Sequence, residues 1–139
     1  MRKGFTLIEL LIVLVIISIL SSMAIIDSKP SIDMAYSKAE MNDAKNAITE
    51  EASFFLSNRF YDSVSGSYAD STKGMLTGDN GSKFSVSEFN TIDITVKSCG
   101  SADGYLIHVT NEKVDTEVFY DSCVDSAPRE VTPWKRLIH

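Results

Sequence analysis

Residues 4–9 read GFTLIE, and residues 10–26 continue as LLIVLVIISILSSMAII, an almost unbroken apolar run in a chain of 139 residues. As an α-helix, the segment from Phe5 to Ile26 would be about 33 Å long, which matches the roughly 30 Å hydrocarbon core of a bilayer. Arg2 and Lys3 precede the run. Basic residues before a span predict that this end stays in the cytoplasm while the rest is exported. The segment 5–26 is therefore predicted to be a transmembrane helix.

Glu9 is the one charged residue in this run. A carboxylate inside a membrane helix costs about 2.5–3.5 kcal/mol on insertion scales, so a partner for it is expected. The alternative is an ordinary secretory signal peptide, which the small residues around Ser22, Met23 and Ala24 would allow a peptidase to cleave. The run is longer than the usual signal-peptide core of about 7–15 residues, and Glu9 interrupts it. These two features favour a retained helix.

The basic start, Gly4, Phe5 and the isolated Glu9 before a long apolar run resemble the processing motif of type IV pilins and of the type II secretion pseudopilins. The resemblance covers residues 1 to about 30. It implies that residues 1–4 are a leader peptide, removed by a membrane peptidase that cuts between Gly4 and Phe5, and that Phe5 is then N-methylated. It also implies an assembly role for Glu9, whose carboxylate would neutralise the new Phe5 amine on its own helix or on a neighbouring subunit.

The same resemblance implies a structural function, that of a pilin in a type IV pilus used for adhesion, twitching motility or DNA uptake. The implied partners are identical or related pilin subunits, the prepilin peptidase, an inner-membrane assembly platform and its ATPase motor. The chain would lie in the inner membrane as a precursor and afterwards in an extracellular pilus. Two alternatives remain: a minor pilin or type II secretion pseudopilin, and a membrane-anchored binding domain that never polymerises.

Composition argues against other functions. The net charge of −6 disfavours direct nucleic-acid binding, which needs clustered lysine and arginine. No phosphate-binding loop, zinc spacing or nucleophile elbow is present, so we expect neither an enzyme nor a cofactor. His108 and His139 have no ligand or catalytic partner at a suitable spacing.

Acidic turns leave calcium binding as an open alternative. The candidate oxygen ligands are Asp79, Asn80, Asp121 and Asp125. Trp134 is expected to hold the C-terminal tail on the head.

Residues 27–58 are predicted to form an amphipathic helix that continues into the head, because apolar residues recur every three or four positions. Pro30 should kink this helix or begin a new one. The expected buried stripe is Ile32, Ala35, Tyr36, Ala39, Met41, Ala44, Ile48, Ala52 and Phe55. The expected exposed face is Lys38, Glu40, Asp43, Lys45, Glu50 and Glu51.

Residues 59–139 are predicted to form a globular head. Residues 57–83 are rich in serine, glycine and asparagine, which is typical of a long loop. Alternation predicts a strand at 91–97, and short apolar segments predict two more at 105–109 and 117–120. Residues 84–86 are a candidate fourth. The expected fold class is α+β, with one long N-terminal helix, transmembrane in its first half, packed on an antiparallel sheet of three or four strands.

Cys99 and Cys123 lie at the two ends of the predicted strand set. In an exported chain, a cysteine pair suggests a disulfide formed outside the cytoplasm, and two unrelated buried thiols are the alternative. A bond between them would tie the C-terminal segment to the sheet. That arrangement resembles the cysteine-bounded C-terminal region of many type IV pilins.

Overall fold

The computed structural model describes residues 4–23 and 29–132, and the chain divides into two units, residues 1–32 and 33–139. Each unit is considered by itself. The leader at 1–4, the span at 5–26 and the helix at 27–58 each reach into residues outside the described part. Trp134 also lies outside it.

Helix α1 (Leu7–Met23) is the folded part of the first unit and has 17 residues. Helix α2 (Lys29–Asn58) has 30 residues, and Pro30 lies in its first turn. Proline is well tolerated there because its missing N–H would have no helical acceptor. Within the described residues, no helix combines the length and the apolar character needed to cross a membrane.

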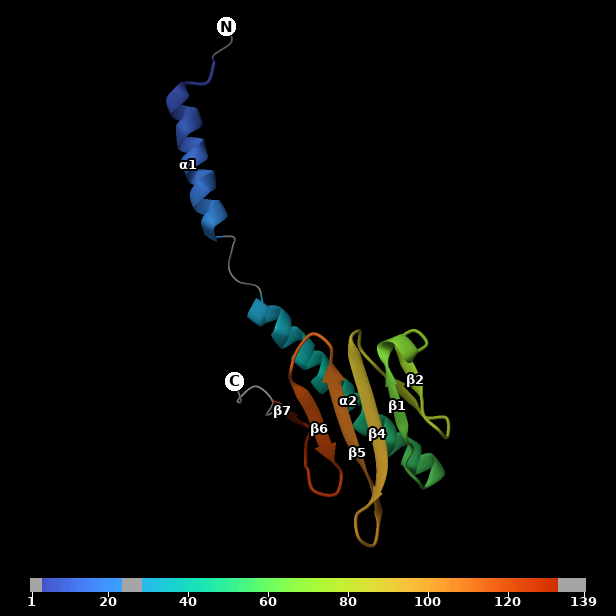
Figure 1. Ribbon diagram of the computed structural model, residues 1–139. Helices are drawn as coiled ribbons and strands as arrows, with labels where there is room; N and C mark the ends of the chain where they lie inside the picture. The colour runs from blue at the N-terminus through green and yellow to red at the C-terminus, as the bar shows by residue number, and fades with distance from the viewer. Residues whose placement is uncertain (1–3, 24–28, 133–139) are drawn as a thin grey trace. The chain divides into compact units, whose positions relative to one another are not determined.

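The main sheet of the second unit has five strands in the order β1-β4-β5-β6-β7, and all neighbours are antiparallel (Figure 1). The strands are β1 (Val64–Ser67), β4 (Asn90–Ser98), β5 (Asp103–Asn111), β6 (Glu117–Asp121) and β7 (Arg129–Val131). In β4 and β5, buried and partly exposed residues alternate, as expected for a sheet with one face covered. The predicted α+β class is therefore confirmed.

The expected number of strands is wrong. A two-stranded sheet of β2 (Met75–Thr77) and β3 (Lys83–Ser85) accompanies the main sheet, which itself has five strands. The segment expected to be a long loop, 57–83, contains β1, the 3-10 helix η1 (Tyr68–Asp70) and β2. These pieces have only three or four residues each, so partners in the fold, rather than their own propensity, make β1 and β2 strands. Strand β7 also follows Cys123, which is therefore not beyond the last strand.

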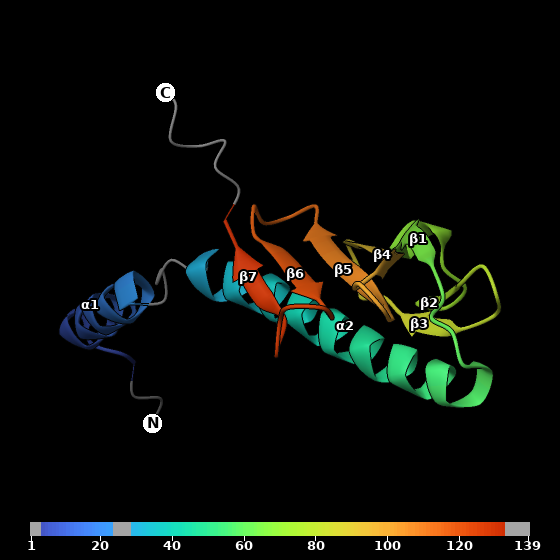
Figure 2. The ribbon, with the colours of Figure 1, turned by 90° about the horizontal axis from the view of Figure 1, so that it is seen from below.

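Helix α2 runs along one face of the main sheet, from β7 at its beginning towards β1 at its end (Figure 2). Its fully buried apolar residues are only two alanines, Ala44 and Ala47, with Met41 and Ile48 partly buried beside them. Small side chains let the helix approach the sheet closely. The strands supply the rest of the core, which is Val64, Leu76, Phe84, Val86, Ile92, Ile94, Tyr105, Ile107, Val109 and Val118.

The expected exposure of three α2 carboxylates is wrong. Glu40, Asp43 and Glu51, called the carboxylate row below, are buried. The residues that face the sheet are 40, 43, 44, 47 and 51, so the buried face is rotated away from the apolar stripe predicted from the sequence. Because the alanines bring the helix close to the sheet, longer neighbours on the same face are enclosed with them.

Each member of the carboxylate row holds a different loop of the head. Glu40 accepts a hydrogen bond of 2.7 Å from the hydroxyl of Thr116, which lies just before β6. Asp43 accepts bonds from the backbone and hydroxyl of Ser87 and from the amide of Asn90, in the turn before β4. Glu51 accepts a bond of 3.1 Å from the backbone N–H of Asp62, just before β1. The row thus fixes three loops to one helix.

Candidate processing and assembly site

The residues before α1 form a helix cap. The backbone N–H of Thr6 and its hydroxyl both donate to Oε2 of Glu9, at 2.9 Å each, and the backbone N–H of Glu9 donates to the Thr6 hydroxyl at 3.3 Å. This reciprocal pattern is a capping box, in which a threonine at the helix start and a glutamate three residues later satisfy each other's backbone N–H groups. A Glu side chain in the first turn also suits the positive end of the helix dipole.

The predicted cleavage point is open in the structure. Gly4 and Phe5 lie in non-helical chain before α1, and Phe5 is 86% exposed. A Cβ built on Gly4 would meet no atom within 4 Å. The geometry therefore allows a peptidase to approach this peptide bond, and a side chain at position 4 would not be crowded by the described part of the subunit.

Helix α1 is apolar on all sides. Its leucines, isoleucines and valines are about half exposed or more around the whole circumference, and Glu9 is the one charged residue among its 17. The hydroxyl of Ser18 donates to the carbonyl of Leu14 at 2.7 Å, so this polar group is satisfied within the helix. A helix that is hydrophobic all round is stable only when other apolar groups cover it.

In the head, Cys99 and Cys123 form a disulfide with their Cα atoms 5.5 Å apart. Beside it, Lys97 and Asp121 form an ion pair of 2.7 Å. The hydrogen bond from Lys97 holds the pKa of Asp121 below its usual value. Gly104 on β5 lies against the bond, where a Cβ would collide with Sγ of Cys99 and with the hydroxyl of Ser122.

Three of the four candidate calcium ligands are engaged with other residues. Asp121 pairs with Lys97, Asp125 pairs with Arg129 at 3.5 Å, and the Asn80 side chain donates to Asp62 at 2.9 Å. Across the part of the chain that the structure describes, no cluster of three or more potential metal ligands is found.

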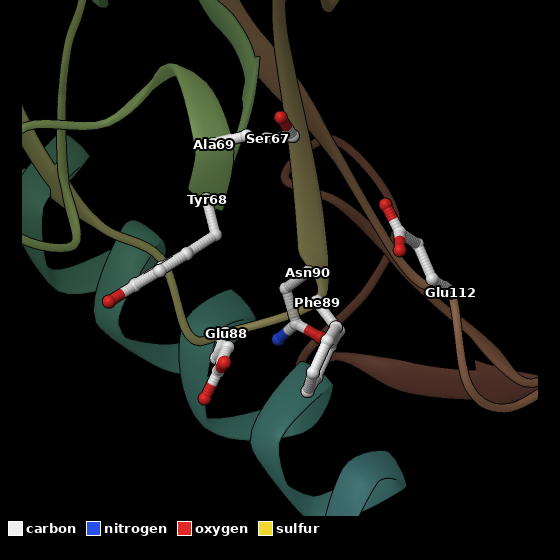
Figure 3. Close-up of a pocket in the computed structure, with 7 residues that line it drawn as sticks. All are labelled: Ser67, Tyr68, Ala69, Glu88, Phe89, Asn90 and Glu112. Carbon is white, nitrogen blue, oxygen red and sulfur yellow. The ribbon is translucent and has the colours of Figure 1, made fainter.

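A shallow pocket of about 240 Å³ opens between η1 and the turn before β4 (Figure 3). Tyr68, Glu88, Phe89 and Glu112 are among its lining residues. In Figure 3, Glu88 and Glu112 lie on opposite sides of Phe89 rather than converging on one point. These two carboxylates therefore do not form a joint site in this pocket.

The structure gathers the predicted residues at two separate places. Gly4, Phe5 and Glu9 belong to the first unit, and the cysteine pair belongs to the second. Sequence reasoning missed Thr6, although the spacing Thr-x-x-Glu at the start of an apolar run is the pattern of a capping box. It also missed the carboxylate row, for which hydropathy gives no indication.

Residues 1–25 match the family described as the prokaryotic N-terminal methylation motif. Comparison with curated proteins and with solved structures finds no match for the chain. Gly4, Phe5, Thr6 and Glu9 all lie inside the matched range, so the capping box is part of the motif segment. The chain therefore carries, at its N-terminus, the class III signal of type IV pilins and pseudopilins.

Proposed function

We propose that the chain is a filament subunit of the type IV pilin class, cut after Gly4, N-methylated at Phe5 and polymerised through α1. The observation that carries the proposal is the methylation motif at residues 1–25 placed directly on an all-round apolar helix. Such a helix needs lipid around it before assembly and the helices of other subunits afterwards. The partners would be other pilin subunits, the prepilin peptidase, and an inner-membrane platform with its ATPase motor.

Glu9 supports an assembly role in addition to capping. Both bonds from Thr6 use the same oxygen, Oε2. Cleavage after Gly4 would create an amine on Phe5, next to Thr6. In a packed bundle of helices, an unpaired amine is strongly destabilising, whereas an amine opposite the carboxylate of Glu9 is neutralised. Pairing between these groups would set the axial position of each subunit.

The head supports export to an oxidising compartment. Its disulfide joins the end of β4 to the segment after β6, and cytosolic reductants would keep such a pair reduced. We propose that the head lies outside the inner membrane in the precursor and on the filament surface after assembly.

The test is intact mass and N-terminal analysis of filaments sheared from cells. We expect a subunit that starts at N-methyl-Phe5. Gly4→Leu should accumulate as unprocessed precursor in the membrane, while Gly4→Ala, which keeps a small residue, should still be cut. An N-terminus near residue 25 would instead support a conventional signal peptide and would contradict the proposal.

The amount of the chain in sheared material separates a main pilin from a minor pilin or a pseudopilin. A main subunit would dominate the filament protein, and a minor one would be present in traces. Correct processing with complete absence from filaments would identify a membrane-anchored domain that does not polymerise.

A further inference from the structure

Two members of the carboxylate row carry an oxygen with no partner. Glu40 and Glu51 are both 0% exposed. In each, Oε2 accepts one hydrogen bond, from Thr116 and from the N–H of Asp62 respectively, while Oε1 has none. Asp43 differs, because three donors from the turn before β4 surround its two oxygens.

The groups that face these two side chains are acidic or phenolic. Around Glu40 they are Glu130 on β7, Glu117 on β6 and Asp43 on the same helix. Around Glu51 they are Asp62 and the hydroxyl of Tyr105 on β5. Among the described residues, the cations in ion pairs are Lys97, His108 and Arg129, and each pairs with another acid.

A carboxylate in such a place is far more stable with its proton. An ionised group that is buried, poorly hydrogen-bonded and next to other acids has lost its water and gained no counter-charge. Burial raises the pKa of Glu40 to about 7, and neighbouring acids add to the effect. Burial likewise raises the pKa of Glu51 to about 7.

We infer that the junction between α2 and the sheet is a proton-operated latch, which is closed while Glu40 and Glu51 are protonated and loosens when they ionise. Each glutamate holds one loop, since Glu40 binds Thr116 before β6 and Glu51 binds Asp62 before β1. The bonds from Thr116 and Asp62 favour the ionised carboxylates, but burial outweighs them. Ionisation would therefore destabilise the packing of α2 at two separate points beneath the sheet, although the two bonds themselves are kept.

The direction of the effect follows from the two pKa values of each glutamate. In the unfolded chain the glutamates lose their protons near the ordinary value of 4.5, and in the folded head they lose them near 7. Between these values the folded state binds more protons than the unfolded state, so stability falls as pH rises. The stabilisation is complete below about pH 4.5 and is gone above about pH 7.

The test is urea unfolding of the full-length chain in detergent micelles, followed by circular dichroism at pH 5 and at pH 8. For the wild type, we expect the equilibrium constant for unfolding to increase on the order of a hundredfold per glutamate over this range. The isosteric variants Glu40→Gln and Glu51→Gln should each remove about half of this pH dependence of unfolding. The double variant should show the weakest pH dependence. Glu50→Gln, which changes the exposed neighbour of Glu51, is the matched control and should follow the wild type.

The ion pair between His108 and Glu117 also requires a protonated imidazole. It is present in every protein compared, so the difference between wild type and double variant isolates the two glutamates. An equal pH dependence of unfolding in the wild type and the double variant would overturn the latch.

If the double variant does not fold, carbon NMR of the side-chain carboxyls in the wild type decides. Titration of Glu40 and Glu51 near 4.5 in the folded chain would overturn the proposal, and titration near 7 would support it.

Discussion

At the scale of single residues, Asp62 shows how a buried carboxylate stays ionised. Its two oxygens accept bonds from the backbone N–H groups of Ser63, Asn80 and Ser82 and from the side chains of Asn80 and Ser82. Burial pushes the pKa of Asp62 upwards, but the bonds from Ser82 and Asn80 together outweigh it and hold the pKa below the usual 3.8. The stabilisation that ionised Asp62 gives the folded head is therefore present at neutral pH and is lost as pH falls below about 3.8. This pH dependence is opposite in direction to that of Glu40 and Glu51.

Asp62→Asn should lower the free energy of unfolding at pH 7 by about 1–3 kcal/mol, because an amide cannot accept from all of these donors and leaves some of them unsatisfied. Urea unfolding of the full-length chain in micelles measures this. Asp79→Asn is the control, since Asp79 is exposed in the same loop, and it should change little. Equal stability of both variants would show that the loop at 78–82 is held in another way.

At the scale of elements, hydrophobic patterns in the sequence were sufficient to predict the longest helices and strands. The apolar run gave α1, the recurrence of apolar residues gave α2, alternation gave β4, and short apolar segments gave β5 and β6. These patterns failed for β1 and β7, which have four and three residues and pair with a longer strand, and for β2, which pairs with the equally short β3. They also failed for the carboxylate row, because burial of a charged residue depends on donors contributed by distant loops.

The start of α1 allows capping and charge pairing to be separated. Glu9→Gln keeps a residue that completes the capping box but removes the charge, while Glu9→Val removes both. If Glu9 neutralises the Phe5 amine, both variants should insert in the membrane and be cut after Gly4, and both should give few filaments. Filament counts by electron microscopy and intact mass of the membrane fraction measure the two steps.

Normal filament numbers with Glu9→Gln and loss with Glu9→Val would show that Glu9 acts through the cap alone. Loss of processing in either variant would place its role in recognition by the peptidase. The roles of Gly4, Phe5 and Glu9 stay predictions until these variants are measured.

At the scale of the whole molecule, the disulfide compensates for a small core. The bond between Cys99 and Cys123 joins residues 24 apart in sequence and restrains the segment that leads from β6 to β7. Chain-entropy arguments give about 3.5 kcal/mol for a loop of this length. We expect the double variant Cys99→Ser, Cys123→Ser to lose roughly that much stability in urea unfolding.

Ser101→Ala and Ser126→Ala are suitable controls, because both serines are exposed near the bond. The wild type treated with a reductant should unfold at the same urea concentration as the double variant. A reduced wild type as stable as the oxidised form would mean that the hydrogen-bonded frame alone holds the C-terminal segment.

The carboxylate row also bears on how the head tolerates variation. Its carboxylates accept hydrogen bonds from backbone N–H, hydroxyl or amide groups that lie close to where a strand begins. None of these donors lies at an exposed loop tip. The bonds of the carboxylate row do not reach the loop tips, so substitutions there should leave the packing of α2 on the sheet unchanged, except at 78–82, where Asp62 holds the loop. A foreign peptide inserted at another tip would then be displayed on an unaltered scaffold.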